Sequence, residues 1–410
     1  MASSNSPSTF PAYLNEEFFK KCLANSLGEH ETKINDVKMT MGSGLGDNYT
    51  SFIYRAFINY SDSHGDSKSL SIIIKSIPTD GDRAFLEEID VYAKEIDIYL
   101  KVLPLMHGIL EESRVAPRCY FAVESPIRTI VFEDLREKGF YLAERQLGLN
   151  EDHCKVVLNK MAKFHASSMV ALRKMPSIRE RFKDGFFNKD AFESDIFQAF
   201  FRKNFKRGAE IVTEMPGYEH FAPKLMNIFN NFCTKAQESI AFKENNLVVL
   251  NHGDLWSSNI MFKYDKETGT PVDAIFVDYQ MCYVNSLALD LNYFFVTSSQ
   301  PDVLSRKKEF VEKFYYPAFE EVLKNVDFES IPTLNEIFQE MEKRELFALF
   351  NLFGELPIMS LAKEDSITNN YAEFVDEEKA SKARNAGMST KRFTDMMQYA
   401  LKYYEKLKVL

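Results

Sequence analysis

The pattern of apolar and polar residues changes about a third of the way along the chain. Five early segments carry the β-branched and aromatic residues typical of strands, with polar or glycine-containing stretches between them: 37–41, 50–60, 70–77, 119–123 and 129–133. Residues 84–103 instead follow a helical pattern, which we expect to end at Pro104. The pattern predicts a small antiparallel sheet with one long helix inserted after its third strand.

The segments that flank this sheet have other patterns. Residues 1 to about 14 are expected to form a flexible tail, and 15–28 a short helix capped by Asn15. Beyond residue 140 helical patterns dominate, beginning with a helix capped by Asn150 whose apolar positions are Val157, Met161, Phe164 and Met169. We therefore predict an α+β fold with two lobes, in three parts: a tail and short helix (1–27), a sheet lobe (28–135) and a mainly helical lobe (136–410).

Composition and charge narrow the class of protein. The net charge of −10 argues against a nucleic-acid-binding protein, which would need a basic surface to bind phosphates. The five cysteines are scattered and form no C-x-x-C pair, which favours reduced thiols in a cytoplasmic protein over disulfides or a zinc site. We find no secretory signal and no run of about 20 apolar residues. We expect a soluble cytoplasmic protein with neither nucleic acid nor membrane as a partner.

The segment NHGDLWSSN (251–259) gathers polar side chains between apolar strands. Residues 247–250 form the strand before it, and 260–264 and 272–277 form a hairpin after it that ends at Asp278. If the hairpin pairs symmetrically around 268–269, Asn259 lies opposite Asp278. An amide and a carboxylate oxygen suit Mg²⁺, which takes few protein ligands, and Asp254 could accept the proton of an attacking hydroxyl. Ordinary turn residues are the alternative, but the combination favours phosphoryl transfer.

A second candidate site lies near the N-terminus. The glycine-rich segment GSGLGDNY (42–49) lies between two predicted strands, and Lys75 lies in the apolar strand IIIK. A lysine there is costly unless it is paired, and a phosphate together with Glu87, Glu88 or Glu95 could pair it. The chain has no G-x-x-x-x-G-K-[ST] motif, so the arrangement is that of kinases and not of P-loop enzymes.

Over residues 37 to about 330 the chain resembles the ecdysteroid kinase-like family of insects, within the wider choline kinase and aminoglycoside phosphotransferase group. The resemblance rests on GSGLGDNY, IIIKSI, EIDIYLKVLP, VFEDLREKGF, KMAKFHASS, HGDLWSSNIMF, VDYQ and ALDLNYF. It implies a two-lobed protein-kinase-like fold with ATP and Mg²⁺ between the lobes. Two departures, Tyr279 in place of the usual Phe and Cys282 shortly after it, touch no catalytic role.

The resemblance also implies a role for individual residues. Asp254 would be the catalytic base, and Asn259 and Asp278 the Mg²⁺ ligands. Lys75 would contact the phosphates and pair with Glu95. Asp290 would hold the catalytic loop. The remaining ATP-binding residues would be those of the glycine-rich loop and of the hinge that meets adenine: Gly42, Ser43, Gly44, Gly46, Asn48, Glu133, Asp134 and Leu135.

For three conspicuous residues we expect structural rather than catalytic roles. His252 is expected to bond to backbone and shape its loop, because an aspartate serves as base in this chemistry. His165 is expected to be a partly buried, hydrogen-bonded core residue. Trp256 is expected to pack against the catalytic loop rather than to line the acceptor pocket. The absence of H-x-x-x-H and G-x-S-x-G motifs argues against a zinc site and the simplest hydrolase.

The sequence thus predicts an ATP- and Mg²⁺-dependent kinase acting on a hydroxyl of a small, mostly apolar molecule. The family resemblance makes an ecdysteroid, or a related steroid or xenobiotic, the first choice of acceptor. The alternatives are a choline- or ethanolamine-type kinase and a catalytically silent ligand-binding relative. Phe347, Phe350 and Phe353 recur every three residues and are candidates for the acceptor pocket, although such a stripe is more often core. Protein partners and oligomeric state are not predicted.

Overall fold

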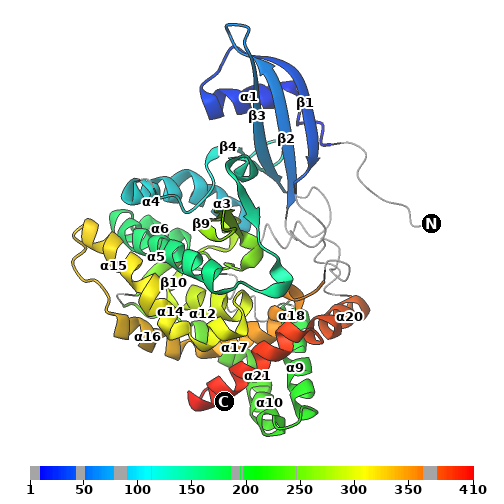
Figure 1. Ribbon diagram of the computed structural model, residues 1–410, viewed down its shortest axis with the longest axis vertical. Coiled ribbons are helices and arrows are strands. Elements are labelled where there is room, and N and C mark those ends of the chain that lie inside the picture. Colours follow the sequence, from blue (N-terminus) through cyan, green and yellow to red (C-terminus); the bar gives the residue numbers. More distant parts are fainter. Residues whose placement is uncertain are drawn as a thin grey trace.

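The computed structural model describes residues 10–42, 51–77, 90–111, 113–185, 194, 197–245, 247–362 and 376–410. A small β-rich lobe stands on a larger helical lobe (Figure 1), which confirms the predicted α+β architecture. The first lobe is built from α1 (Glu16–Leu27), β1 (Lys33–Met41), β2 (Phe52–Ser61), β3 (Ser67–Ser76), β4 (Cys119–Val123) and β5 (Thr129–Glu133). Its five strands are all antiparallel, in the order β1-β2-β3-β5-β4.

Helix α1 covers one face of this sheet (Figure 1). Its buried residues Phe18 and Leu23 pack in one cluster with the inward-facing side chains of β2 and β3, because alternate strand residues point to the same side. Residues 10–14, predicted as part of a flexible tail, instead pack on the lobe: Leu14 is buried, and the Tyr13 hydroxyl bonds to Thr129 at 3.0 Å. The tail prediction was wrong here because these apolar residues gain burial against the sheet.

The helical segment after β3 runs further than predicted. It consists of α3 (Val91–Asp97), a π-helical turn η1 (Ile98–Val102) and α4 (Leu103–Leu110); residues 84–89 lie outside the described residues. The expected end at Pro104 was wrong, because the π turn starts a new helical segment in which Pro104 falls in the first turn. A missing N–H costs little there.

The second lobe contains most of the helices: α5 (Glu151–Lys174), α6 (Ser177–Arg181), η4 (Gln198–Arg202), α9 (Lys203–Thr213), η5 (Glu219–Phe221), α10 (Ala222–Asn230), α11 (Phe232–Ile240), α12 (Ala288–Thr297), α13 (Pro301–Ser305), α14 (Lys307–Phe310), η8 (Val311–Tyr315), α15 (Tyr316–Asn325), α16 (Leu334–Lys343), α17 (Glu345–Gly354), α18 (Leu356–Met359), α20 (Glu377–Met388) and α21 (Lys391–Lys406). Short strands and 3-10 turns lie among them: η2 (Leu135–Lys138), β6 (Phe140–Leu142), η3 (Arg145–Leu147), β7 (Val248–Asn251), η6 (Ser257–Asn259), β8 (Ile260–Tyr264), β9 (Pro271–Phe276), η7 (Tyr279–Met281) and β10 (Tyr283–Ser286). Helix α5 is the central element and is capped by Asn150, as predicted.

The phenylalanines considered for an acceptor pocket are buried. Phe350 and Phe353 pack against Phe205, with ring centroids 5.6 and 5.2 Å away. Phe347 belongs to a separate buried cluster that includes Trp256. The stripe is therefore core, the more common of the two interpretations. No helix in the described part of the chain has the length and apolar character to cross a membrane.

Candidate active site

The loop between β7 and β8 is fixed by backbone contacts. Gly253 has φ of +82°, and a Cβ there would lie 2.1 Å from the Met281 carbonyl oxygen, so the HGD motif requires glycine. Asp290 accepts hydrogen bonds from the backbone N–H groups of His252 (2.6 Å) and Gly253 (3.0 Å). Asp290 therefore holds the loop, in the manner that the resemblance implied.

The two histidines in and near this loop make contacts that stabilise the fold. The His252 ring lies 3.1 Å from the Val277 carbonyl oxygen, and burial lowers the pKa of His252. His165 is fully buried between the Tyr315 hydroxyl (2.8 Å) and the Asp290 carboxylate (3.2 Å). Both agree with the structural interpretation from sequence.

The hairpin that follows has a register one residue away from the predicted one. Ile260 pairs with Phe276, and the Val277 N–H donates to the Asn259 carbonyl at 2.9 Å, so Val277 and not Asp278 lies opposite Asn259. The reason is the turn, which closes by a hydrogen bond from Asp265 to Thr270 and is followed by a bulge. Asn259 and Asp278 nevertheless line the same pocket.

Asp254 lies among polar partners that sequence reasoning only partly found. The Asn259 side-chain amide donates to its backbone oxygen (2.8 Å) and its carboxylate (3.0 Å). The Tyr293 hydroxyl lies 2.6 Å from Asp254 and also 2.6 Å from Glu355. A hydroxyl has one proton, so Tyr293 can donate to only one of these two carboxyl groups at a time. Burial, and next the charge of Glu355, raise the pKa of Asp254, and burial raises the pKa of Glu355 to about 7.

Tyr293 and Glu355 were missed. Tyr293 lies in the apolar segment LNYFF, where its hydroxyl gave no local signal. Glu355, however, is the single charged residue in LFALFNLFGELPIM (346–359). A carboxylate in an apolar segment is destabilising unless it has a partner. This cost could have identified Glu355 as a candidate site residue from the sequence.

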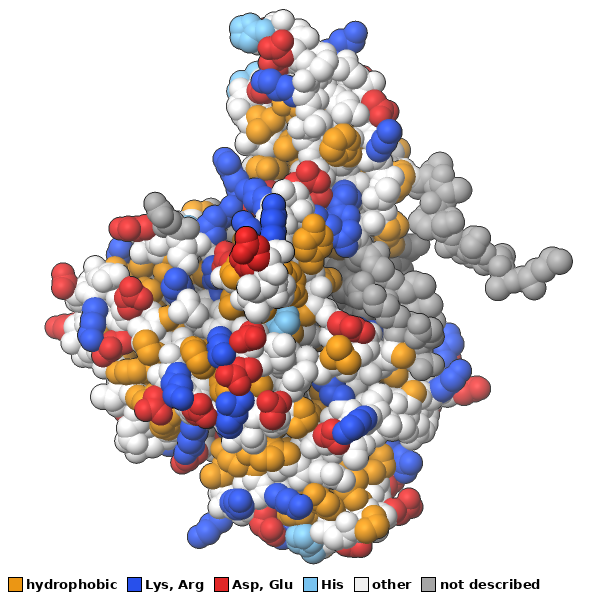
Figure 2. All heavy atoms as spheres, viewed as in Figure 1, with side chains coloured by type: hydrophobic (Ala, Val, Ile, Leu, Met, Phe, Trp, Pro, Cys, Tyr) orange, Lys and Arg blue, Asp and Glu red, His pale blue; other side chains and the backbone are white. Residues whose placement is uncertain are grey.

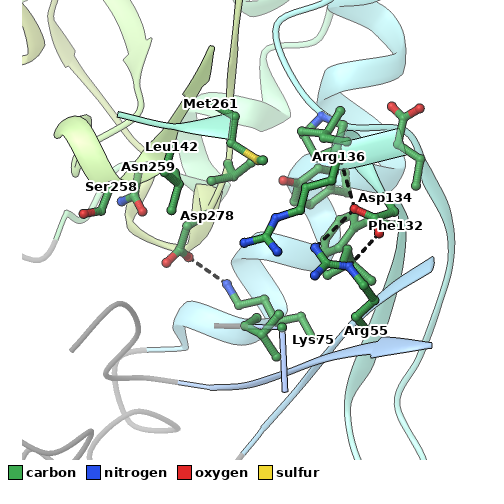
Figure 3. A pocket seen from close by; sticks show the side chains of 18 of the residues that line it. Arg55, Lys75, Phe132, Asp134, Arg136, Leu142, Ser258, Asn259, Met261 and Asp278 are labelled. Atoms are coloured by element: carbon green, nitrogen blue, oxygen red, sulfur yellow. Dashed lines mark hydrogen bonds and ion pairs between the residues drawn. The ribbon is translucent and has the colours of Figure 1, made fainter. Parts of the chain in front are cut away.

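Lys75 joins the two lobes at the mouth of the site. Its ammonium group lies 2.6 Å from the Glu95 carboxylate. It also lies 2.7 Å from Asp278, the contact drawn in Figure 3. Burial alone would lower the pKa of Lys75, but the charges of Asp278 and Glu95 raise it, so the lysine stays charged. Glu95 is thus the described partner among the three candidates; Glu87 and Glu88 lie outside the described residues.

A cavity of about 200 Å³ opens beside Lys75. Figure 3 shows side chains from both lobes around it, with Lys75 on one side and Asn259 on the other. Gly42 lines it, and its N–H donates to the Ile53 carbonyl at 2.7 Å. Ser43, Gly44, Gly46 and Asn48 lie outside the described residues.

The hinge residues Glu133, Asp134 and Leu135 also line this cavity. The carboxylates of the first two are engaged by the protein: Glu133 pairs with Arg114 at 2.7 Å and with Lys138. Asp134 pairs with Arg55 at 2.6 Å. The hinge therefore offers its backbone and Leu135 to a ligand more readily than its carboxylates.

The cavity contains oxygen donors that suit Mg²⁺. Asn259 directs its amide NH₂ to Asp254, which leaves its carbonyl oxygen and the Asp278 carboxylate as donors at the cavity wall. Such a pair fits a hard cation that completes its shell with phosphate oxygens and waters. Asp278 has φ of +66°, an unusual conformation for a non-glycine residue and one found at functional sites. Within the described residues, no group of three or more His, Cys, Asp and Glu side chains forms a metal cluster.

Comparison with known proteins gives one family match. The model of the ecdysteroid kinase-like family matches residues 45–328. No curated protein matches the sequence significantly. Among solved structures, a microcompartment-associated aminopropanol kinase is 13% identical with a TM-score of 0.46, covering 97% of this chain and 99% of that chain. A glucosamine kinase in complex with glucosamine, ADP and inorganic phosphate is 11% identical with a TM-score of 0.32, covering 87% and 95%. These low similarities do not bear on the substrate.

Proposed function

Because the chain belongs to the ecdysteroid kinase-like family, we propose that it transfers the γ-phosphoryl group of ATP to a hydroxyl of a small molecule. The observation that carries this proposal is the contact of Lys75 with both Glu95 and Asp278. These residues come from β3, α3 and the end of the β8–β9 hairpin. A lysine–glutamate pair next to a metal-binding aspartate is the arrangement that kinases use to hold nucleotide phosphates.

In this proposal each residue acts at a stated place. Lys75 binds the α- and β-phosphates, and Glu95 orients it. Asp254 takes the proton of the acceptor hydroxyl, and Tyr293 orients its carboxylate from 2.6 Å. Asn259 and Asp278 hold Mg²⁺, which when bound offsets the charge on the phosphates. The reaction then depends on positioning more than on covalent chemistry.

The nucleotide would be held by the rest of the cavity. Gly42, Ser43, Gly44, Gly46 and Asn48 would cover the phosphates. The backbone of Glu133, Asp134 and Leu135 would meet adenine. The enzyme would work in the cytoplasm, where five unpaired thiols are stable.

We propose an ecdysteroid, or a related steroid or xenobiotic, as the first choice of acceptor, on the strength of the family. One observation favours an amino alcohol instead. Glu355 reaches Asp254 through Tyr293, and Tyr293 lies in a buried cluster with Trp256 and Phe347. A carboxylate next to aromatic faces is a typical site for an organic cation.

A competition assay separates these acceptors. Ecdysone and choline at equal concentration are incubated with ATP, Mg²⁺ and the protein, and the products are identified by mass spectrometry. Phosphorylated ecdysone as main product supports the first choice, whereas phosphocholine promotes the amino alcohol. The Asp254→Asn variant is the control for contaminating kinases. If neither these acceptors nor a wider panel of hydroxyl compounds is phosphorylated, the silent ligand-binding relative becomes the better description.

A further inference from the structure

A second hollow, of about 580 Å³, lies on the helical lobe next to the hinge and has no place in the proposed reaction. It is bounded by η2, β6, α5, β8 and β9 and by the segment after α4. Six of its lining residues are cationic: Arg114, Lys138, Lys155, Lys160, Lys163 and Lys263. One lining residue, Asp273, is acidic. The chain as a whole carries a net charge of −10, so this concentration of positive charge runs against the composition.

The positive charge is only partly balanced by neighbouring carboxylates. Arg114 and Lys138 share Glu133, and Lys160 lies 2.8 Å from Asp273. Lys155 pairs with Glu151 and Asp152 at 3.0 and 3.1 Å. Within the described residues, no carboxylate pairs with Lys163 or Lys263. Two cations of the hollow are therefore left to solvent or to a ligand.

Lys160 forms a rigid floor for the hollow. Its side chain is 8% exposed, and its ammonium group donates to the Arg114 carbonyl oxygen at 2.8 Å. Burial is the main reason that the pKa of Lys160 is lowered; the neighbouring Asp273 raises this pKa, and the charges of Lys163 and Arg114 lower it. Cations that disfavour one another's charge in this way attract an anion placed among them.

Apolar side chains form the walls between these cations. Phe140, Ile275 and Phe314 line the hollow. Lys263 lies over the Phe140 ring and Lys155 over the Phe314 ring, 5.9 and 5.8 Å from the centroids. Low-polarity walls strengthen the attraction between charges inside a concave site.

We propose that this hollow binds a small organic anion that carries two or more phosphate groups. Several cations arranged around a concave surface can each meet a separate phosphate, and charge-assisted hydrogen bonds of this kind are the strong ones. The phosphates can belong to a free metabolite or to a lipid headgroup. The site is distinct from the cavity beside Lys75, and it does not depend on the proposed kinase activity.

Isothermal titration with inositol hexakisphosphate tests the proposal on the full chain. We expect wild-type protein to bind it, and the double variant Lys163→Gln, Lys263→Gln to bind it with affinity lower by about tenfold or more, because each lost charge-assisted contact has an effect of roughly that size. Lys243→Gln with Lys382→Gln is the matched control, since both lysines are exposed and neither lines the hollow. The control should bind like wild type. Thermal melting of all three proteins checks that they are folded.

Two further arms identify the source of the phosphates. Phosphatidylcholine vesicles with and without phosphatidylinositol 4,5-bisphosphate are sedimented with each protein. Binding only to the phosphorylated vesicles, lost in the double variant, supports a lipid headgroup, whereas binding of the soluble probe alone supports a free metabolite. Equal affinity of the double variant and the wild type for both probes overturns the proposal, as does wild-type protein that binds neither.

Discussion

In the proposed reaction Asp254 would take the proton of the acceptor hydroxyl. Asp254→Asn keeps the shape of the side chain and the contact to Tyr293 but removes the base. We expect phosphoryl transfer to fall by roughly 10²–10⁴-fold, the usual contribution of general base catalysis, with nucleotide affinity unchanged. Turnover is measured with labelled ATP and affinity by calorimetry. Wild-type turnover in this variant would show that another group accepts the proton.

Asp278 lines the cavity beside Lys75, and its variant should behave differently from the Asp254 variant. Asp278→Ala removes the proposed metal ligand and a partner of Lys75, which lies 2.7 Å away. We expect nucleotide binding in the presence of Mg²⁺ to weaken by roughly 10- to 100-fold, as for the loss of a charged hydrogen-bonding partner. Calorimetry with Mg²⁺ and with a chelator measures the difference. If both conditions give the same affinity in wild type and variant, Asp278 is not a metal ligand.

The residues of the site differ in how far the sequence could reveal them. Asp254, Asn259 and Asp278 lie within 25 positions of one another in recognisable motifs, and the structure brings all three to one place. Glu355 lies about 100 residues from Asp254 and has no motif. Its contact through Tyr293 depends on how α12 and α18 approach each other, which no local pattern encodes.

At the scale of elements, the strands of the first lobe were predictable, whereas β6 and β10 of the second lobe were not predicted. β1 to β5 were found because each segment carries β-branched or aromatic residues between polar or glycine-containing stretches. The register of the β8–β9 hairpin and the helix across Pro104 were not found. A bulge and a π turn decide these two features, and each inserts one residue without changing the apolar pattern around it. Hydrophobic periodicity can therefore identify an element while leaving its register and its ends open.

Asp134 ties two strands of the first lobe, β2 and β3, to the hinge. Its carboxylate accepts hydrogen bonds from Arg55 on β2 (2.6 Å) and Ser71 on β3 (2.8 Å). Burial alone would raise the pKa of Asp134, but Arg55 and Ser71 outweigh it and lower the pKa. The folded state therefore gains stability from the ionised form. That gain is complete above the ordinary aspartate pKa of about 4 and is lost as pH falls through the lower value in the folded state.

Asp134→Asn should accordingly be less stable than wild type by about 1–3 kcal/mol at pH 7. The gap should close below about pH 4, where the wild-type carboxyl begins to take up its proton. Urea unfolding followed by circular dichroism at several pH values measures it. Asp36→Asn, at an exposed position of β1, is the control and should match wild type throughout. A gap independent of pH would mean that the effect does not come from the charge.

At the scale of the whole molecule, the family match ends at residue 328, but the folded unit continues. Helix α17 packs on α12, and α21 buries Phe393, Met396, Met397, Leu401 and Tyr404. Each such side chain gains about 1.5–3 kcal/mol by leaving water, so deleting α21 removes a large favourable contribution from a fold whose net stability is only roughly 5–15 kcal/mol. We expect a chain ending at residue 328 to lack a cooperative thermal transition, and one ending at 388 to melt far below wild type. Circular dichroism and calorimetry on the three proteins measure this. A chain ending at 328 that melted cooperatively at the wild-type temperature would show that the C-terminal helices are an independent addition.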